Sequence, residues 1–205
     1  MILLNPGPVT LTHRVKTSLL KGDLCHREPE FGQLQQNIRE KLLQVYALDS
    51  STWTSIILTG SGTAAVEALI TSLTPKNSNL LILENGVYGE RIRKIATASK
   101  ITNDQIKSGW GESINFGALE KALSSQKYSH VALVHHETTT GRLNKLEQIL
   151  SLCKHYNCKV LLDAVSSFGA EDISFEGGLI TGVAATANKC LHGVPGISFV
   201  IANRK

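Results

Sequence analysis

The feature that most constrains the fold of this chain is a regular alternation of short apolar runs with amphipathic stretches. The apolar runs occupy residues 56–59, 80–84, 130–137, 159–166, 182–188 and 197–203, with a further short run near residue 106. Apolar residues recur at helical spacing in residues 28–48, 64–73, 89–98, 115–123 and 144–156. Buried strands that alternate with helices predict an α/β domain with a mostly parallel, seven-stranded sheet and helices on both faces.

Two parts of the chain depart from this alternation. The last apolar run follows its predecessor too closely for a helical crossover, so we expect one antiparallel strand there. Near the N-terminus, Pro6 and Pro8 interrupt residues 4–15, which predicts an extended arm without helix. The predicted organisation is an arm over residues 1–27 and one domain over residues 28–205.

Charge and composition exclude several classes of protein. The 21 basic and 17 acidic residues give a net charge of +4 with no basic run, which argues against nucleic acid as a partner. No apolar run approaches the roughly 18–20 residues of a membrane helix, and the N-terminus lacks the basic region of a secretory signal. Four cysteines in 205 residues suggest free thiols in a reducing compartment, so we expect a cytoplasmic protein without a membrane partner.

Parallel sheets of this kind bind ligands at the carboxyl ends of their strands. The first strand there runs into a helix through residues 59–63, Thr-Gly-Ser-Gly-Thr, whose backbone N–H groups and hydroxyls suit a phosphate. The same residues also fit a tight turn that simply needs glycine. A third interpretation is a dinucleotide fingerprint over residues 60–65, with Glu84 as the acid that would bind ribose. The motif alone does not separate the three.

Two further strand ends carry ionisable side chains. Asp163 ends the apolar run that begins at residue 159, and Lys189 follows the run that ends at residue 188. A lysine amine, a strand-end carboxylate and a phosphate turn on one sheet are the three contacts that pyridoxal 5′-phosphate requires. The amine bonds to the cofactor aldehyde, and the carboxylate keeps the pyridine nitrogen protonated.

Other polar residues lie at strand ends too. Tyr88 fits a ring laid on a cofactor and, equally, an ordinary core or surface tyrosine. Residues 135–141 supply hydroxyl groups at the end of the run 130–137, and they also fit a polar turn capped by threonine. His135 and His136 do not predict a metal site, because neighbouring residues of a strand point to opposite faces. We expect no metal.

Several segments resemble the class V, fold type I pyridoxal-phosphate aminotransferases, most closely the 2-aminoethylphosphonate–pyruvate transaminase branch. In family order these segments read LLNPGPVTLTHRV, LTGSGTAAVEA, ENGVYGER, HHETTTGRLN, DAVSSFG and ANKCLHGVPGISFVIANR. They span the chain from Leu3 to Arg204. The resemblance implies the large, cofactor-binding domain of the family. It also implies that the family's smaller C-terminal domain is missing from this chain.

The resemblance also implies roles for individual residues. Lys189 matches the lysine that bonds to the cofactor, and Asp163 matches the partner of the pyridine nitrogen. The implied cofactor-binding residues are Ser61, Gly62, Thr63, Tyr88, Thr138, Asp163, Asn188 and Lys189. The implied substrate-binding candidates are Asn5, Pro6, Gly7 and Arg27.

The activity implied by the resemblance is transamination of 2-aminoethylphosphonate with pyruvate to phosphonoacetaldehyde and L-alanine. Its partners would be a small-molecule amino donor, a 2-oxo acid and, as in the full-length family, a second copy of the chain in a homodimer. Alternatives are an alanine–glyoxylate or serine–pyruvate aminotransferase. Two alternatives from other functional classes are an NAD-binding oxidoreductase domain and a catalytically silent fragment.

Overall fold

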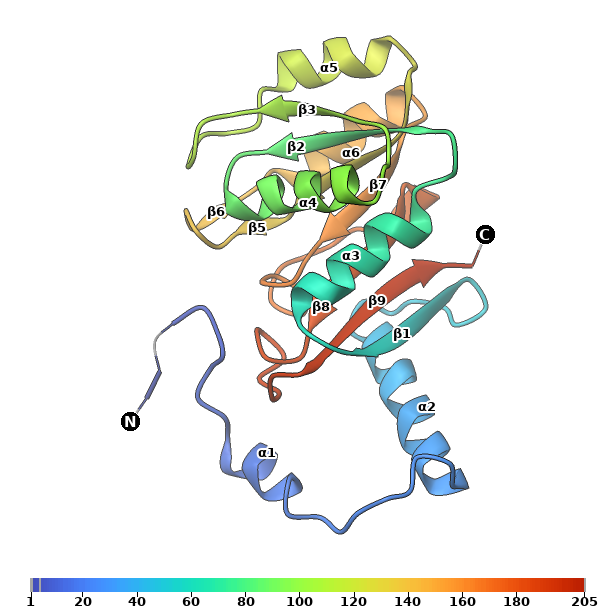
Figure 1. Cartoon of the computed structure of the whole chain (residues 1–205), viewed down its shortest axis with the longest axis vertical. Helices are drawn as coiled ribbons and strands as arrows, with labels where there is room; N and C mark the ends of the chain where they lie inside the picture. Colours follow the sequence, from blue (N-terminus) through green and yellow to red (C-terminus); the bar gives the residue numbers. More distant parts are fainter. Residues whose placement is uncertain (1, 4, 205) are drawn as a thin grey trace.

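A single mixed sheet organises the molecule. The computed structural model describes residues 2–3 and 5–204, which form a seven-stranded sheet with helices on both faces (Figure 1). The strands run across the sheet in the order β1 (Trp53–Thr59), β9 (Ile197–Asn203), β8 (Ile180–Thr186), β7 (Lys159–Asp163), β4 (Tyr128–Val134), β2 (Asn79–Glu84) and β3 (Asn103–Lys107).

Only β9 reverses the direction of this sheet within the described residues. It pairs antiparallel with β1 on one side and with β8 on the other, whereas the pairs from β8 to β3 are all parallel. The predicted antiparallel last strand is therefore confirmed. Because β9 lies between them, β1 and β8 point the same way and end at the same edge of the sheet.

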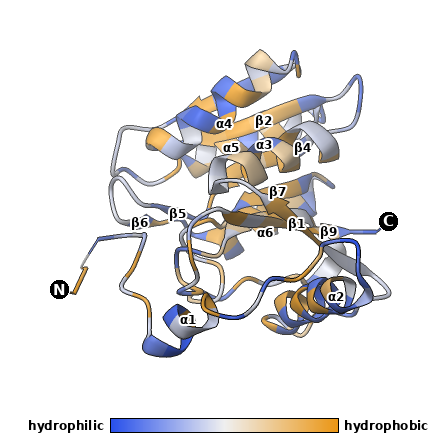
Figure 2. Ribbon diagram, turned by 60° about the horizontal axis from the view of Figure 1, so that its bottom comes forward, coloured by the Kyte–Doolittle hydropathy of each residue, from blue (hydrophilic) through white to orange (hydrophobic). Residues whose placement is uncertain are grey.

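The helices form two layers with separate cores. On one face lie α3 (Gly62–Leu73) and α4 (Val87–Ala98), and on the other α2 (Pro29–Gln44), α5 (Phe116–Ser124) and α6 (Leu146–His155). Successive residues of a strand point to opposite faces of the sheet. Ile82 of β2 therefore packs in the core under α3 and α4, and Leu83 packs in the core under α2, α5 and α6. Figure 2 shows hydrophobic residues along the strands between these layers.

The N-terminal arm differs from its prediction. A short helix, α1 (His13–Ser18), follows the two prolines, and the Thr12 hydroxyl caps it by accepting from Val15 N at 3.4 Å. Proline restricts only itself and the residue before it, so a helix can start five residues after Pro8.

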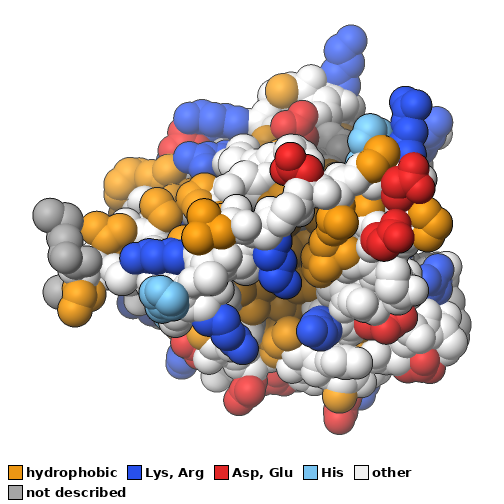
Figure 3. Space-filling view, turned by 90° about the horizontal axis from the view of Figure 1, so that it is seen from below, with side chains coloured by type: hydrophobic (Ala, Val, Ile, Leu, Met, Phe, Trp, Pro, Cys, Tyr) orange, Lys and Arg blue, Asp and Glu red, His pale blue; other side chains and the backbone are white. Residues whose placement is uncertain are grey.

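Figure 3 shows the underside of the molecule, where hydrophobic side chains are visible in a hollow with Lys and Arg side chains near its rim.

A second difference lies after the fourth long strand. The apolar run predicted to continue to residue 137 leaves the sheet after Val134, and a separate hairpin follows, formed by β5 (His136–Glu137) and β6 (Arg142–Leu143). A single 3₁₀ turn, η1 (Glu176–Gly178), precedes β8. No helix in the described ranges is both long enough and apolar enough to cross a membrane.

We expect Ile82→Ala to destabilise the chain far more than Ile56→Ala. Ile82 is fully buried between β2 and the α3–α4 layer, whereas Ile56 on β1 is 40% exposed. Truncation of a buried isoleucine costs about 2–5 kcal/mol of unfolding free energy, and the exposed site should cost less than about 1 kcal/mol. Urea unfolding of both variants measures the difference, and equal losses would contradict this two-layer core.

Candidate functional site

A cavity of about 200 Å³ lies at the carboxyl ends of β1, β7 and β8, next to the first turns of α3 and α4. It gathers most of the side chains that the sequence singled out. The predicted residues that line it are Ser61, Gly62, Thr63, Tyr88, Asp163, Asn188 and Lys189. They come from four separate segments of the chain, and the parallel sheet brings these segments to one edge.

The first turn of α3 forms one wall of this cavity. Ser61 is the N-cap residue, but its side chain makes no capping bond. Within the described part of the chain, the backbone N–H groups of Gly62 and Thr63 have no acceptor. Free N–H groups at the positive end of a helix dipole bind anions. This wall is therefore suited to a phosphate.

Gly62 lets α3 approach the strand ends closely. A Cβ atom at this position would lie 2.9 Å from Cγ1 of Val165 and 3.6 Å from Cβ of Thr186. Both contacts come from segments at the ends of β7 and β8. A larger residue at position 62 would push the first turn of α3 away from these strand ends.

Asp163, the last residue of β7, supplies a buried carboxylate. Its side chain lies in the cavity wall, the residue is 5% exposed, and Oδ1 accepts a hydrogen bond from Val165 N at 2.9 Å. Burial raises the pKa of Asp163 to about 7, against the lowering effect of the Val165 hydrogen bond; the charge of Glu137 raises it further and that of Arg91 lowers it. A carboxylate in this environment favours a cationic partner.

Lys189 lies beyond the end of β8, and its amine is close to the N-terminal arm. Its Nζ donates to the backbone oxygen of Gly7 at 3.2 Å. Gly7 has a φ of +130°, and a Cβ atom there would lie 2.9 Å from the Asn188 oxygen. Asn188 is itself held by Thr186, whose hydroxyl donates to Asn188 Oδ1 at 2.8 Å. The arm thus reaches the cavity through its glycine.

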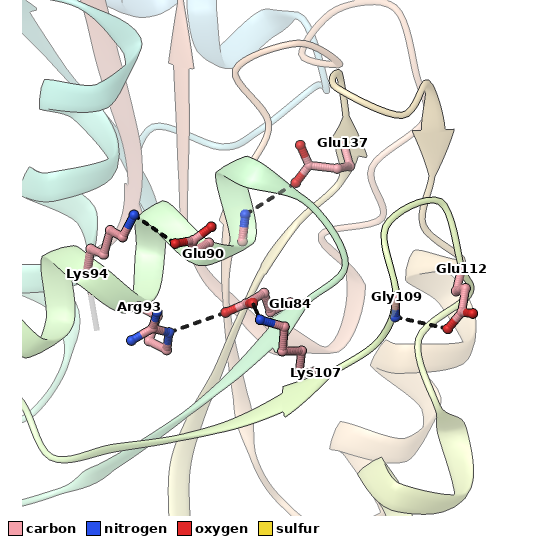
Figure 4. A network of polar contacts seen from close by, with 9 residues as sticks. Glu84, Glu90, Arg93, Lys94, Lys107, Gly109, Glu112 and Glu137 are labelled. Atoms are coloured by element: carbon pink, nitrogen blue, oxygen red, sulfur yellow. Dashed lines mark hydrogen bonds and ion pairs between the residues drawn. The ribbon is translucent and has the colours of Figure 1, made fainter.

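Tyr88 is held at the cavity by the anchored first turn of α4. The fully buried Glu137 accepts hydrogen bonds from the N–H groups of Tyr88 at 3.1 Å and Gly89 at 3.2 Å, and from the Thr139 hydroxyl at 2.8 Å. Figure 4 shows this carboxylate reaching the start of α4. A Cβ atom at Gly86 would run into the Glu137 side chain. The start of α4 is therefore fixed relative to β5.

The remaining predicted residues lie elsewhere. The Thr138 hydroxyl donates to Ser166 Oγ at 3.0 Å, and Thr138 does not line the cavity. Asn5, Pro6 and Arg27 are not among the described residues that line it either. Of the predicted substrate residues, Gly7 is hydrogen-bonded to a residue of the cavity wall, Lys189.

Sequence reasoning missed Arg91, which lines the cavity one helical turn after Tyr88. Its Nη1 donates to Thr63 Oγ1 at 3.0 Å, and its Cζ lies 4.8 Å from the centre of the Tyr88 ring. The i, i+3 spacing in residues 88–91 places both side chains on one face of a helix. That spacing was a signal that could have found Arg91.

Glu84 forms two ion pairs with basic side chains of the same fold. Its carboxylate, 2% exposed, pairs with Arg93 at 3.3 Å and Lys107 at 3.1 Å (Figure 4). The dinucleotide interpretation needs this carboxylate to bind ribose, and both of its oxygens are already engaged. The structure therefore removes the main support for an NAD site.

Comparisons with known proteins agree on one family. The model of the class-V aminotransferases matches residues 16–205. A 2-aminoethylphosphonate–pyruvate transaminase of Bacillus cereus is 40% identical over 204 residues, 99% of this chain and 56% of that protein. A bifunctional phosphonoacetaldehyde hydrolase/aminoethylphosphonate transaminase of Clostridioides difficile is 38% identical over 205 residues, all of this chain and 32% of that protein.

Solved structures show the same architecture. An aspartate aminotransferase from Thermus thermophilus superposes with a TM-score of 0.89 at 27% identity, covering 100% of this chain and 57% of that one. An alanine–glyoxylate aminotransferase from Nostoc gives 0.89 at 28% identity, covering 99% and 53%. The chain thus spans about a third of the C. difficile relative and little more than half of the other three. The predicted fold, the large domain of fold type I, is confirmed.

We expect Asp163→Asn to stabilise the cofactor-free chain, and to do so more at high pH. The pKa of Asp163 is about 7 in the folded state and about 3.9 in an unfolded chain. The folded state therefore binds the extra proton between these values, and stability falls as pH rises from about 4 to about 7. The advantage of the amide should be about 2 kcal/mol larger at pH 8 than at pH 5.

Urea unfolding of both proteins at the two pH values measures this difference. The buried His130 and His135, whose pKa values burial lowers to about 4, are present in both proteins and cancel. An advantage that does not change with pH would contradict the burial of a charged Asp163.

We expect Gly62→Ala to cost about 1–3 kcal/mol of stability, because the new methyl group meets Val165. In a Val165→Ala background the same substitution should cost much less, since the clashing methyl groups are gone. Gly32→Ala is the matched control: it lies in α2 with open space around it, so alanine should stabilise by about 0.5–1 kcal/mol. Additive costs for Gly62→Ala and Val165→Ala would refute the close contact.

Proposed function

The chain belongs to the class-V aminotransferase family, whose cofactor is pyridoxal 5′-phosphate, and we propose that its cavity binds this cofactor for transamination. The observation that carries the proposal is the convergence of Lys189, Asp163 and the first turn of α3 on one cavity. Because the chain spans 56% of the B. cereus relative, the activity and substrates of the whole protein are part of the proposal.

The donors and acceptors of the cavity fit such a ligand. Free N–H groups of Gly62 and Thr63 suit a phosphate, and the buried carboxylate of Asp163 suits a protonated ring nitrogen. Lys189 supplies a primary amine within the same space. An anionic end, a cationic ring atom and a reactive aldehyde would each have a partner of the right chemistry.

Each residue then has a definite task. When bound, the cofactor acts as an electron sink for the substrate carbon that loses a proton. Lys189 would hold the cofactor through its Nζ, and the same amine, when free, would accept the proton that leaves the substrate carbon and donate it back. Gly7, whose backbone oxygen accepts from Nζ, orients the amine.

Asp163 and Tyr88 set the environment for that proton transfer. Asp163 would hold a positively charged ring nitrogen, and that charge would lower the pKa of this carboxyl from its raised value. The Tyr88 ring, at the cavity wall, would cover one face of a flat ligand and exclude water from it. Both effects favour a protonated, desolvated cofactor ring.

For the substrates we propose 2-aminoethylphosphonate as the amino donor and pyruvate as the acceptor. The names of the B. cereus and C. difficile relatives, at 40% and 38% identity, support this choice. The Nostoc alanine–glyoxylate aminotransferase, at 28% identity, supports the second candidate, transfer between alanine and glyoxylate. We further propose that residues 28–205 are the cofactor domain, that residues 1–27 are an arm and that the working enzyme is a homodimer.

Borohydride reduction tests the cofactor assignment. After incubation with pyridoxal 5′-phosphate and reduction, peptide mass spectrometry should find the pyridoxyl label on Lys189. Lys189→Ala should lose the label, whereas Lys159→Ala, at a lysine that donates to the backbone oxygen of Gly178, should keep it. Absence of the label from Lys189 in the unmodified chain would refute the assignment. If Lys189 takes no label and NAD raises the melting temperature of the chain, the oxidoreductase interpretation would be favoured.

Substrate assays separate the two candidate reactions. We expect release of phosphonoacetaldehyde from 2-aminoethylphosphonate and pyruvate, and little consumption of glyoxylate with alanine. The reverse preference would replace the proposed donor. A labelled Lys189 without either reaction would assign the chain a binding function only.

A further inference from the structure

We propose that Arg91 is a positioning residue for the cofactor phosphate, acting through the hydroxyl of Thr63 and the ring of Tyr88. The inference rests on the proposed function and extends it to a residue outside the sequence-predicted set. Arg91 lies in α4, whereas Thr63 lies in the first turn of α3. It is therefore the side chain that connects the two helix starts bordering the cavity.

The hydrogen bond between Arg91 and Thr63 has a fixed direction. A guanidinium only donates, so Thr63 Oγ1 accepts from Nη1 at 3.0 Å. The hydroxyl hydrogen of Thr63 is then left to point elsewhere. Next to the free N–H groups of Gly62 and Thr63, it adds another donor aimed at an anion. A hydroxyl can both donate and accept hydrogen bonds, and Arg91 thus leaves the Thr63 hydroxyl to act as a donor toward the cavity.

The same guanidinium also lies over the Tyr88 ring, with Cζ 4.8 Å from the ring centre. A cation at this distance is attracted to the face of an aromatic ring. The planar guanidinium can stack on the ring while an N–H at its edge reaches Thr63, whereas a lysine ammonium lacks this geometry. The two contacts fix the aromatic wall and the phosphate turn relative to each other.

The rest of α4 supports this arrangement. Glu137 anchors the helix start through the N–H groups of Tyr88 and Gly89, so Arg91 extends from a fixed turn. Its positive charge also lowers the pKa of Asp163, which keeps that carboxyl more ionised. Arg91 and Lys189 are the cationic residues that line the cavity within the described residues, and both favour an anionic ligand.

Arg93 provides a matched control on the same helix. It lies two residues from Arg91 and is absent from the described cavity lining. Its guanidinium pairs with Glu84 at 3.3 Å, and Lys107 also pairs with that carboxylate. Arg93→Gln therefore removes a charge from α4 and leaves both Thr63 and Tyr88 untouched.

The test is an equilibrium titration with pyridoxal 5′-phosphate, followed by absorbance, of the unmodified chain and of Arg91→Gln, Arg91→Lys and Arg93→Gln. Arg91→Gln should raise the Kd by about tenfold or more, because a charge-assisted contact is lost. Arg91→Lys should recover only part of the affinity, and Arg93→Gln should stay within about threefold of the unmodified chain. Without cofactor the melting temperature should fall more for Arg93→Gln, which leaves the buried Glu84 carboxylate with Lys107 alone, so a general loss of stability would not explain a weaker Kd of Arg91→Gln.

A double-mutant cycle with Thr63→Val tests whether Arg91 acts through the hydroxyl. In the valine background, Arg91→Gln should change the Kd by much less than tenfold, because the hydroxyl that it orients is absent. Fully additive effects, or equal Kd values for Arg91→Gln and Arg93→Gln, would overturn the inference. If Lys189 in the unmodified chain takes no label, the proposed function fails and the inference falls with it. A labelled Lys189 with an unchanged Kd for Arg91→Gln refutes the inference alone.

Discussion

The arrangement of the candidate site depends on a carboxylate that the fold removes from water. Asp163 is placed at the end of a central strand, with a single N–H donor at Oδ1 and a second carboxylate, Glu137, near enough to raise its pKa further. Such a group is costly unless a positive charge joins it. Lys189, Arg91 and the first turn of α3 line the same cavity as this carboxylate.

Asp163 and Lys189 could be predicted from sequence because parallel strands share an edge. Both follow apolar runs, and any sheet built from those runs brings their side chains near the turn at residues 59–63. The position of β9 was also predictable, from the short connection alone. Local patterns were sufficient here, because the topology that they imply has few alternatives.

The features that the sequence did not reveal depend on contacts between distant segments. Glu84 stands where a ribose-binding acid would, but Arg93 and Lys107 approach it from α4 and β3. Thr138 has a suitable hydroxyl, yet the chain leaves the sheet after Val134 and directs that hydroxyl to Ser166. In the sequence, Arg91 looks like an ordinary surface charge on α4. Its contact with Thr63 at the start of α3 is visible only in the structure. Local spacing can place Arg91 on the same helix face as Tyr88, but it does not predict Thr63 as its partner, because the two residues lie on different helices.

The pairing of β1 with β9 has a consequence for the order in which the chain acquires its site. Within the described sheet, β1 has β9 as its one neighbour, and the turn at residues 59–63 follows directly from β1. The two strands are separated by more than half of the sequence, and the contact between Gly7 and Lys189 spans 182 residues. Contacts of such long range form slowly, after local structure. During synthesis on a ribosome, the turn at residues 59–63 emerges early, but β1 lacks its sheet partner until residue 203 has been added.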